Sequence, residues 1–142
     1  MSARDVQLRF DENVRHRILV TPFYSPEALP SLLLGYNLLL FPSLTEGFPL
    51  APLEAMACSS AVIVSDVPGI AERLQDDENA LLIPPRDQQA IENAVQSLID
   101  NPDKFYNLRI AAHKFAQNYS WKRIAVDTIS LYQAALQRRN NV

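Results

Sequence analysis

Residues 37–65 read NLLLFPSLTEGFPLAPLEAMACSSAVIVS, and they carry the clearest fold signal in the chain. Two short apolar runs, NLLLF at 37–41 and AVIVS at 61–65, are typical of strands that are buried on both faces. A loop rich in turn residues and the helical segment LEAMAC lie between them. A strand, a helix and a second strand in this order predict a βαβ unit with parallel strands.

This alternation continues on both sides of the unit. Two further apolar runs, RILVTPF at 17–23 and ALLI at 80–83, predict one strand before it and one after it. Predicted helices separate and follow the strands, and they begin near Pro26, Ala51, Asp66, Asp87, Asp103 and Ser120. The sequence therefore predicts a Rossmann-like α/β fold, with a parallel sheet of about four strands in a three-layer α/β/α arrangement.

The organisation of the chain follows from these elements. We interpret residues 1–16 as a polar, loosely structured lead-in and residues 17–138 as one domain. The domain is expected to be incomplete, because a doubly wound sheet usually has about five or six strands. In the last helix, an apolar stripe around Trp121 keeps helical spacing and is expected to pack in the core.

The composition excludes several classes of protein. The chain has 142 residues and a net charge of -3, which argues against a broad basic face for nucleic acid. No apolar run approaches the roughly 20 residues needed to cross a bilayer, and MSARDVQLRF lacks the apolar middle of a signal peptide, so a cytoplasmic protein is expected. One cysteine, Cys58, and two distant histidines, His16 and His113, make a metal site unexpected. The three glycines, at 35, 47 and 69, exclude both the GxGxxG and the GxxxxGKS/T phosphate loop.

The candidate ligand site lies in the loop after the strand at 37–41, because ligands of such sheets bind at the carboxyl ends of the strands. The next helix points its free N–H groups and the positive end of its dipole at this loop, which suits a phosphate. Gly47 lets the backbone approach a ligand closely. Glu46 and Glu54 can accept hydrogen bonds from sugar or ribose hydroxyls, although either one taken alone would be an ordinary surface acid. Together these features predict a nucleotide-sugar site.

Four segments in a fixed order resemble a known family. FPSLTEGFPLAPLEAMAC, followed by AVIVSDVPGIAE, is similar to the signature region of the group 1 glycosyl transferases, which are retaining enzymes of the GT-B fold. Glu46 and Glu54 match the E-x7-E motif of that family. ENALLIPPRDQQAIENAVQSLIDNP and NYSWKRIA resemble later parts of the same C-terminal, donor-binding domain, so the resemblance covers about residues 17–136.

The resemblance implies a role for each residue of the loop. Glu46, the catalytic residue in this scheme, would bond hydroxyls of the donor sugar, and Glu54 would bond the ribose of the nucleotide. The backbone of the segment between them would hold the sugar and the diphosphate through Gly47, Phe48, Pro49 and Leu50. The loop at 22–25 would contact the base. The donor would be a UDP-, GDP- or ADP-linked sugar, and no cofactor or metal is expected.

The sequence also departs from the family pattern. Ser59 and Ala80 stand where the family commonly has glycine. The basic residues that grip the diphosphate, and the acceptor-binding domain, would come from elements preceding residue 1, so the chain is expected to be truncated at its N-terminal side. A non-catalytic fragment or a subunit that depends on a partner is therefore the alternative function, and a Rossmann-like domain for another nucleotide ligand is a third. Pairing with the missing domain, or self-association through an apolar sheet edge, is also expected. A peripheral membrane position of the full enzyme is an alternative to a free cytoplasmic one.

Smaller expectations concern single residues. Cys58 is expected to be a small buried residue, and Asp66 to cap the helix that follows it. His16 and His113 are expected to have surface or capping roles. Pro52 is expected to be the first residue of its helix, because a start at Pro49 would cost that helix a hydrogen bond.

Overall fold

The computed structural model describes residues 2–69 and 71–140, and the chain forms two compact units that meet between Leu32 and Leu33. The first unit contains α1 (Ala3–Gln7), α2 (Glu12–Arg15) and the 3-10 turn η1 (Pro26–Ala28). α3 (Leu29–Leu33) runs across the boundary between the units. The lead-in at 1–16, expected to be loosely structured, thus contains two short helices, each begun by a side-chain cap at Ser2 or Asp11.

The predicted strand at 17–23 is wrong. The backbone after Arg17 has no regular structure until η1, and Leu19 and Phe23 are 75% and 90% exposed. An apolar run becomes a strand only where a neighbouring strand accepts its hydrogen bonds. Within residues 2–32 no strand is described, so this run has no partner in its own unit.

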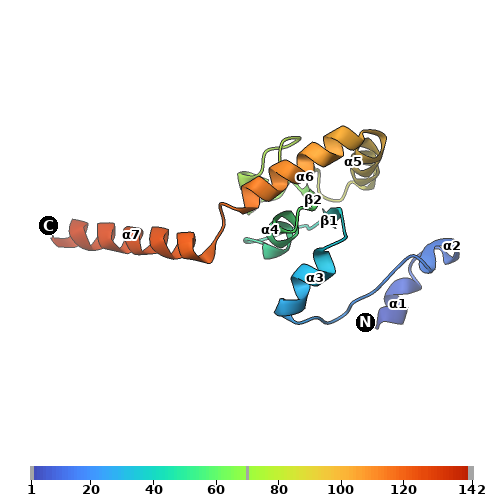
Figure 1. Ribbon diagram of the computed structural model, residues 1–142, viewed down its shortest axis with the longest axis horizontal. Helices are drawn as coiled ribbons and strands as arrows, with labels where there is room; N and C mark the ends of the chain where they lie inside the picture. Colours follow the sequence, from blue (N-terminus) through green and yellow to red (C-terminus); the bar gives the residue numbers. More distant parts are fainter. Residues whose placement is uncertain (1, 70, 141–142) are drawn as a thin grey trace. The chain divides into compact units, whose positions relative to one another are not determined.

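The second unit is built on a parallel sheet of three strands, in the order β1 (Leu38–Phe41), β2 (Ala61–Ser65) and β3 (Leu81–Ile83). β1 and β2 are labelled in Figure 1. Leu38 pairs with Ala61 and Ile63 with Leu81. These strands match the predicted runs at 37–41, 61–65 and 80–83, with one strand fewer than expected. The Rossmann-like α/β fold class is confirmed.

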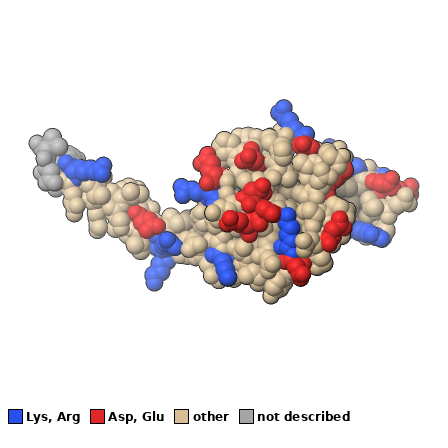
Figure 2. Space-filling view, turned by 90° about the horizontal axis from the view of Figure 1, so that it is seen from above, with Lys and Arg blue, Asp and Glu red and all other residues tan. Residues whose placement is uncertain are grey.

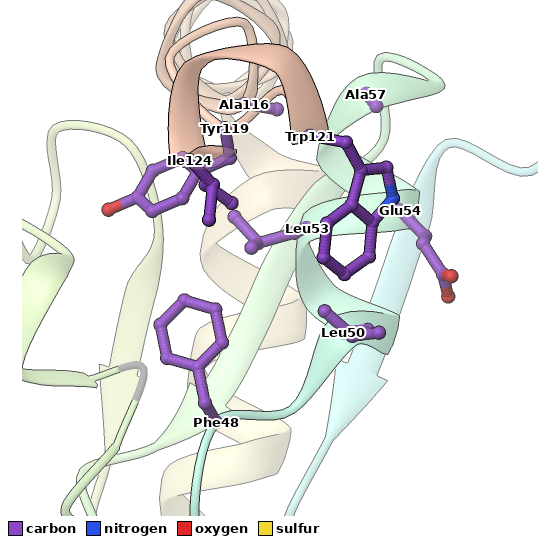
Figure 3. Close-up of a pocket in the computed structure, with 9 residues that line it drawn as sticks. All are labelled: Phe48, Leu50, Leu53, Glu54, Ala57, Ala116, Tyr119, Trp121 and Ile124. Atoms are coloured by element: carbon purple, nitrogen blue, oxygen red, sulfur yellow. The ribbon is translucent and has the colours of Figure 1, made fainter. Parts of the chain in front are cut away.

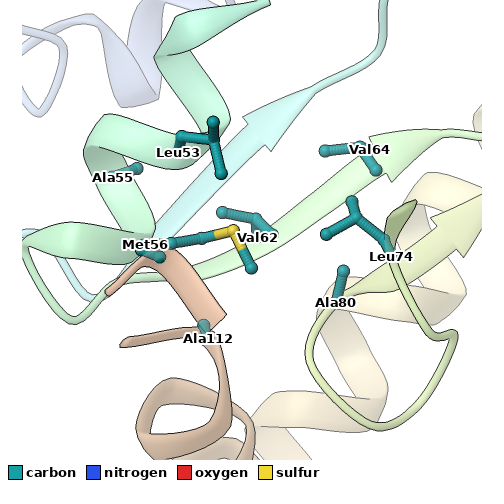
Figure 4. Close-up of a cluster of buried hydrophobic side chains, with 9 residues drawn as sticks. Leu53, Ala55, Met56, Val62, Val64, Leu74, Ala80 and Ala112 are labelled. Atoms are coloured by element: carbon teal, nitrogen blue, oxygen red, sulfur yellow. The ribbon is translucent and has the colours of Figure 1, made fainter. Parts of the chain in front are cut away.

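Helices cover both faces of the central strand β2, whose five residues are all buried. Val62 and Val64 pack against Met56 of α4 (Leu50–Ala57) on one face (Figure 4). Because successive strand residues point to opposite faces, Ile63 packs on the other side, with Leu98 of α5 (Gln88–Asp100). α4 and α5 therefore form the two outer layers around the sheet.

The helices of the second half begin where the sequence places their caps. The Asp87 side chain accepts a hydrogen bond from the Ala90 amide at the start of α5, at 2.9 Å. α6 (Pro102–Ala116) begins with a proline, and the Asn101 side chain caps it through the Lys104 amide. Ser120 accepts from the Arg123 amide where α7 (Trp121–Asn140) begins. The expected helix after Asp66 is only the 3-10 turn η2 (Ala71–Arg73).

α4 begins at Leu50, two residues before the predicted first helical residue Pro52, with Pro49 at the capping position. Pro52 is then the third helical residue rather than the first. The first four N–H groups of a helix have no partner within that helix. Pro52 therefore removes no helical hydrogen bond, and the conflict that motivated a later start does not exist.

The C-terminal end of α4 is held by two side chains of α6. The Arg109 Nε–H donates to the Ser59 carbonyl at 2.8 Å, and His113 Nδ1 lies 3.0 Å from the Ala57 carbonyl oxygen. A carbonyl can only accept, so His113 carries its proton on Nδ1 and Nε2 accepts from the Gln117 amide. The expected capping role of His113 is confirmed, and the helix that it caps is α4 rather than its own.

Ser59 occupies the left-handed region, with a φ of 62°, just past the end of α4. Its amide donates to the Met56 carbonyl and the Ser60 amide to the Ala55 carbonyl, which is the usual closing pattern of a helix with glycine at this position. Serine takes this conformation at an energetic cost because its Cβ approaches the backbone.

Replacing Ser59 with Gly should therefore raise the free energy of unfolding by about 0.5–1 kcal/mol, since glycine removes the Cβ strain but gains freedom in the unfolded chain. Urea unfolding followed by circular dichroism measures the change. Ser130→Gly, at an exposed position inside α7, is the matched control and should have the opposite sign. A loss of stability in Ser59→Gly would contradict the left-handed backbone at this site.

The apolar stripe of α7 is not core, contrary to the expectation from its spacing. Trp121, Leu131 and Tyr132 are 79%, 71% and 68% exposed, and no residue of 121–138 is buried. Helical spacing predicts that a helix has an apolar face, but it does not predict that the layer covering this face belongs to the same unit. Among the residues that the structure describes, no helix has the combination of length and hydropathy needed to span a bilayer.

Candidate functional site

The loop at 42–49 leaves the carboxyl end of β1 and enters α4 directly. Glu46 is half-buried in it, and the Ser43 hydroxyl donates a hydrogen bond to Glu46 Oε1. The same hydroxyl lies 3.3 Å from the Thr45 carbonyl oxygen. No partner of Oε2 is found among the described residues, so this oxygen of the carboxylate can accept a hydrogen bond from a ligand.

Gly47 follows Glu46 and faces open space. Apart from its two chain neighbours, no described residue would have an atom within 4 Å of a Cβ built on Gly47, and the φ of Gly47 is not positive. Neither the backbone conformation nor packing within the chain therefore requires glycine here. The room in front of Gly47 agrees with the expectation that a ligand approaches the backbone at this residue.

The loop that leaves the neighbouring strand β2 touches this turn. Gly69 has a φ of +110°, and a Cβ on it would lie 3.2 Å from the Gly47 carbonyl carbon and 3.3 Å from the Glu46 carbonyl oxygen. The Gly47 carbonyl oxygen would be closer still. The carboxyl ends of β1 and β2 thus bring Gly69, absent from the predicted site, against two residues that belong to it. The sequence contained Gly69 within SDVPGIAE but gave no sign of this contact.

The N-terminus of α4 offers fewer hydrogen-bond donors than expected. The four positions whose N–H groups a helix leaves free are occupied here by Pro49, Leu50, Ala51 and Pro52. Proline has no N–H, so Leu50 and Ala51 provide the two free donors, together with the positive end of the helix dipole. These are fewer free amides than a helix beginning at Pro52 would have offered to a phosphate.

Three predicted site residues line an apolar pocket of about 220 Å³ beside α4 (Figure 3). These are Phe48, Leu50 and Glu54, whereas Glu46, Gly47 and Pro49 do not line it. The rest of the wall is formed by α4, the end of α6 and the start of α7, through Leu53, Ala57, Ala116, Tyr119, Trp121 and Ile124. The Glu54 carboxylate points away from the middle of the pocket in Figure 3.

Aromatic rings make up much of this wall. The Phe48 and Tyr119 ring centroids lie 6.2 Å apart, and those of Phe115 and Tyr119 lie 5.1 Å apart. Such tilted pairs are favourable and hold the rings in place. The motif NYSWKRIA, interpreted from sequence as a closing helix, therefore also supplies Tyr119 and Trp121 to the pocket.

Charge does not point to another kind of ligand. On the face of the molecule drawn in Figure 2, acidic and basic side chains are interspersed without a continuous basic area. Residues 42–54 contain Glu46 and Glu54 but no lysine or arginine. Within residues 2–69 and 71–140, no group of three His, Cys, Asp or Glu side chains is placed to hold a metal ion.

Comparison with known proteins gives one consistent result. The family model described as glycosyl transferases group 1 matches residues 7–118. The chain is 28% identical over 136 residues to the D-inositol 3-phosphate glycosyltransferase of Rhodococcus erythropolis, which covers 96% of this chain and 31% of that protein. The chain therefore spans about a third of the length of this relative.

Solved structures agree with this match. Sucrose-phosphate synthase from Thermosynechococcus elongatus superposes with a TM-score of 0.79 at 30% identity, over 89% of this chain and 32% of that one. The C-terminal domain of a glycosyl transferase group 1 family protein from Francisella tularensis superposes with a TM-score of 0.68 at 25% identity, over 82% of this chain and 64% of that one. The range matched by the family model, residues 7–118, includes the loop at 42–49 and α4.

Proposed function

The chain belongs to the group 1 glycosyl transferase family, and from this premise we propose that its second unit is the donor-binding part of a retaining glycosyltransferase. In this proposal, a sugar passes from a nucleotide diphosphate sugar to an acceptor. The observation that carries it is the Glu46–Gly47 turn. This turn lies at the carboxyl end of β1, ahead of the α4 N-terminus, with open space beside Gly47.

The geometry supports a division of labour between the two carboxylates. Glu46 is fixed through Oε1 by Ser43, so that Oε2 can accept a hydrogen bond from a hydroxyl of the donor sugar. Glu54 is the fifth residue of α4, about one turn from its start, and would accept from the ribose hydroxyls. The free amides of Leu50 and Ala51 lie between these two carboxylates and would face the diphosphate.

This arrangement suits the chemistry of sugar transfer. The bond between the anomeric carbon and the diphosphate oxygen breaks, and negative charge grows on the leaving diphosphate. Donors and dipoles fixed in advance stabilise such charge without reorganising during the reaction. The two amides and the dipole of α4 would contribute here. The acceptor hydroxyl then forms the new bond to the anomeric carbon, and its proton passes to the leaving diphosphate.

The remainder of the site would come from outside the described unit. Residues 42–54 contain no lysine or arginine, so they offer no basic side chain to neutralise the diphosphate. No further strand in the described part of the chain pairs with the second edge of β1, and the apolar face of α7 is exposed. These features support a missing acceptor-binding domain or partner chain. Self-association is the alternative arrangement.

The incomplete donor site in this unit also favours a second candidate function. The chain supplies two amides and two carboxylates, but the loop has no basic side chain. Such a chain could act as a non-catalytic fragment, or as a subunit that needs a partner for activity. The two functions differ in whether the chain binds a donor by itself, and this can be measured directly.

Calorimetric titration with UDP-, GDP- and ADP-glucose tests the proposal. We expect binding tighter than about 1 mM for one of the three, and Glu54→Gln should weaken it about 10- to 100-fold, the effect of losing a hydrogen bond to a charged group. Because Glu54 would contact ribose, the free nucleotide should lose affinity equally. Glu92→Gln, on the exposed side of α5, is the matched control. If the unmodified chain shows no detectable binding, the result favours a subunit that needs a partner. Undiminished binding by Glu54→Gln would contradict the ribose contact.

A further inference from the structure

We infer that Gly69 is a positioning residue, which holds the Glu46–Gly47 turn where the sugar of the donor would bind. This inference rests on the proposed function for the identity of the ligand. The contact itself is independent of any ligand, because it joins the loops after β1 and β2 within one unit.

Two conditions at Gly69 are satisfied only by glycine. Its φ of +110° lies in a region that residues with a side chain rarely adopt. Any Cβ would also overlap the Gly47 carbonyl group. Gly47 meets neither condition, since it has open space and no positive φ. Of Gly47 and Gly69, the fold therefore requires Gly69, which is not among the predicted site residues.

A Cβ at position 69 would move the turn rather than the loop that carries it. The loop after β2 is anchored by the Asp66 amide, which donates to the Ile83 carbonyl of β3 at 2.8 Å, and by the buried side chain of Val67. The Glu46–Gly47 turn has free space beside Gly47. The less restrained partner gives way, so the carbonyls of Glu46 and Gly47 would be displaced.

The turn is held at its side chain as well as at its backbone. The Ser43 hydroxyl binds the Glu46 carboxylate, while Gly69 contacts the backbone of Glu46 and Gly47. α4 does not depend on either contact, because Leu53 and Met56 anchor it in the core. Displacement of the turn should therefore disturb the sugar contact at Glu46 and leave the ribose contact at Glu54 in place.

The chain contains a matched control for this effect. Gly35 has a φ of +104°, close to that of Gly69, but among the described residues other than its chain neighbours a Cβ there would meet nothing within 4 Å. Gly35→Ala introduces the same backbone strain without the contact. The difference between Gly69→Ala and Gly35→Ala therefore isolates the effect of touching the turn.

The first measurement needs no ligand. In two-dimensional ¹H–¹⁵N NMR spectra of the full chain, Gly69→Ala should shift the amide signals of Glu46, Gly47 and Phe48, whereas Gly35→Ala should leave them in place. Ser43→Ala, at a half-buried loop position that tolerates a smaller side chain, should shift the Glu46 signal, and Ser43→Thr should restore it. Unchanged turn signals in Gly69→Ala would overturn the inference.

The second measurement compares UDP-glucose with UDP. Gly69→Ala should weaken binding of UDP-glucose about tenfold, as expected for the loss of one charged hydrogen bond, and leave the affinity for UDP nearly unchanged. Equal loss for both ligands would indicate general damage and would overturn the positioning role. If the unmodified chain binds neither ligand, the proposed function fails, while the NMR signals still decide whether Gly69 supports the turn.

Discussion

Replacing Glu46 with Ala in a complete enzyme that contains this segment should lower turnover by about 100- to 1,000-fold, the range observed when one fixed transition-state contact is removed. The structure gives the reason, because Ser43 already occupies one oxygen of this carboxylate and directs the other for use by a ligand. Alanine removes both functions. Steady-state kinetics with saturating donor would measure the change.

The controls separate the role of Glu46 from the loss of a negative charge. Glu92→Ala removes an exposed carboxylate of α5, far along the chain from the loop, and should leave turnover unchanged. Glu46→Gln keeps the length of the side chain and a carbonyl acceptor, so its turnover should lie between those of the parent enzyme and Glu46→Ala. Near-normal turnover of Glu46→Ala would count against the role assigned to this residue.

Replacing Ile63 with Ala should lower the free energy of unfolding by about 2–5 kcal/mol, through lost apolar burial and the cavity that remains. Ile63 is 0% exposed at the centre of β2, packed with Leu98 of α5 and Leu108 of α6. Because the total stability of a domain is only about 5–15 kcal/mol, this one substitution could remove a large share of it. Urea unfolding monitored by circular dichroism gives the value.

Ile129→Ala provides the matched control. It removes the same atoms from a residue of α7 that is 54% exposed, so the free energy of unfolding should change by less than about 0.5 kcal/mol. A large loss at Ile129 would mean that the stripe of α7 is buried in solution. A small loss at Ile63 would contradict its place in the core.

The sequence was informative where an element can be recognised from its own residues. NLLLF, AVIVS and ALLI are short apolar runs with turn residues or prolines beside them, and all three are strands. Asp87 and Asn101 act through amides three residues away, so the starts of their helices were predicted closely. The loop at 42–49 was identified because it follows one of these strands.

The failures arose where a structure depends on a neighbour that is distant in sequence. RILVTPF has the residues of a strand but no strand beside it in its own unit. The stripe around Trp121 has the spacing of a core helix but no covering layer. The contact of Gly69 with Gly47 depends on two loops that meet only after the strands pair, so no local pattern could indicate it.

Because Trp121 is exposed, its intrinsic fluorescence can report on binding in this region. It is the single tryptophan of the chain, it is 79% exposed, and its indole lines the pocket that contains Phe48 and Glu54. Intrinsic emission excited at the red edge of the absorption band therefore comes from one position beside the candidate site. A ligand or a partner chain that covers α7 changes the polarity around that indole. Occupancy of this region can thus be followed by fluorescence, without an added dye and without a change to any residue of the chain.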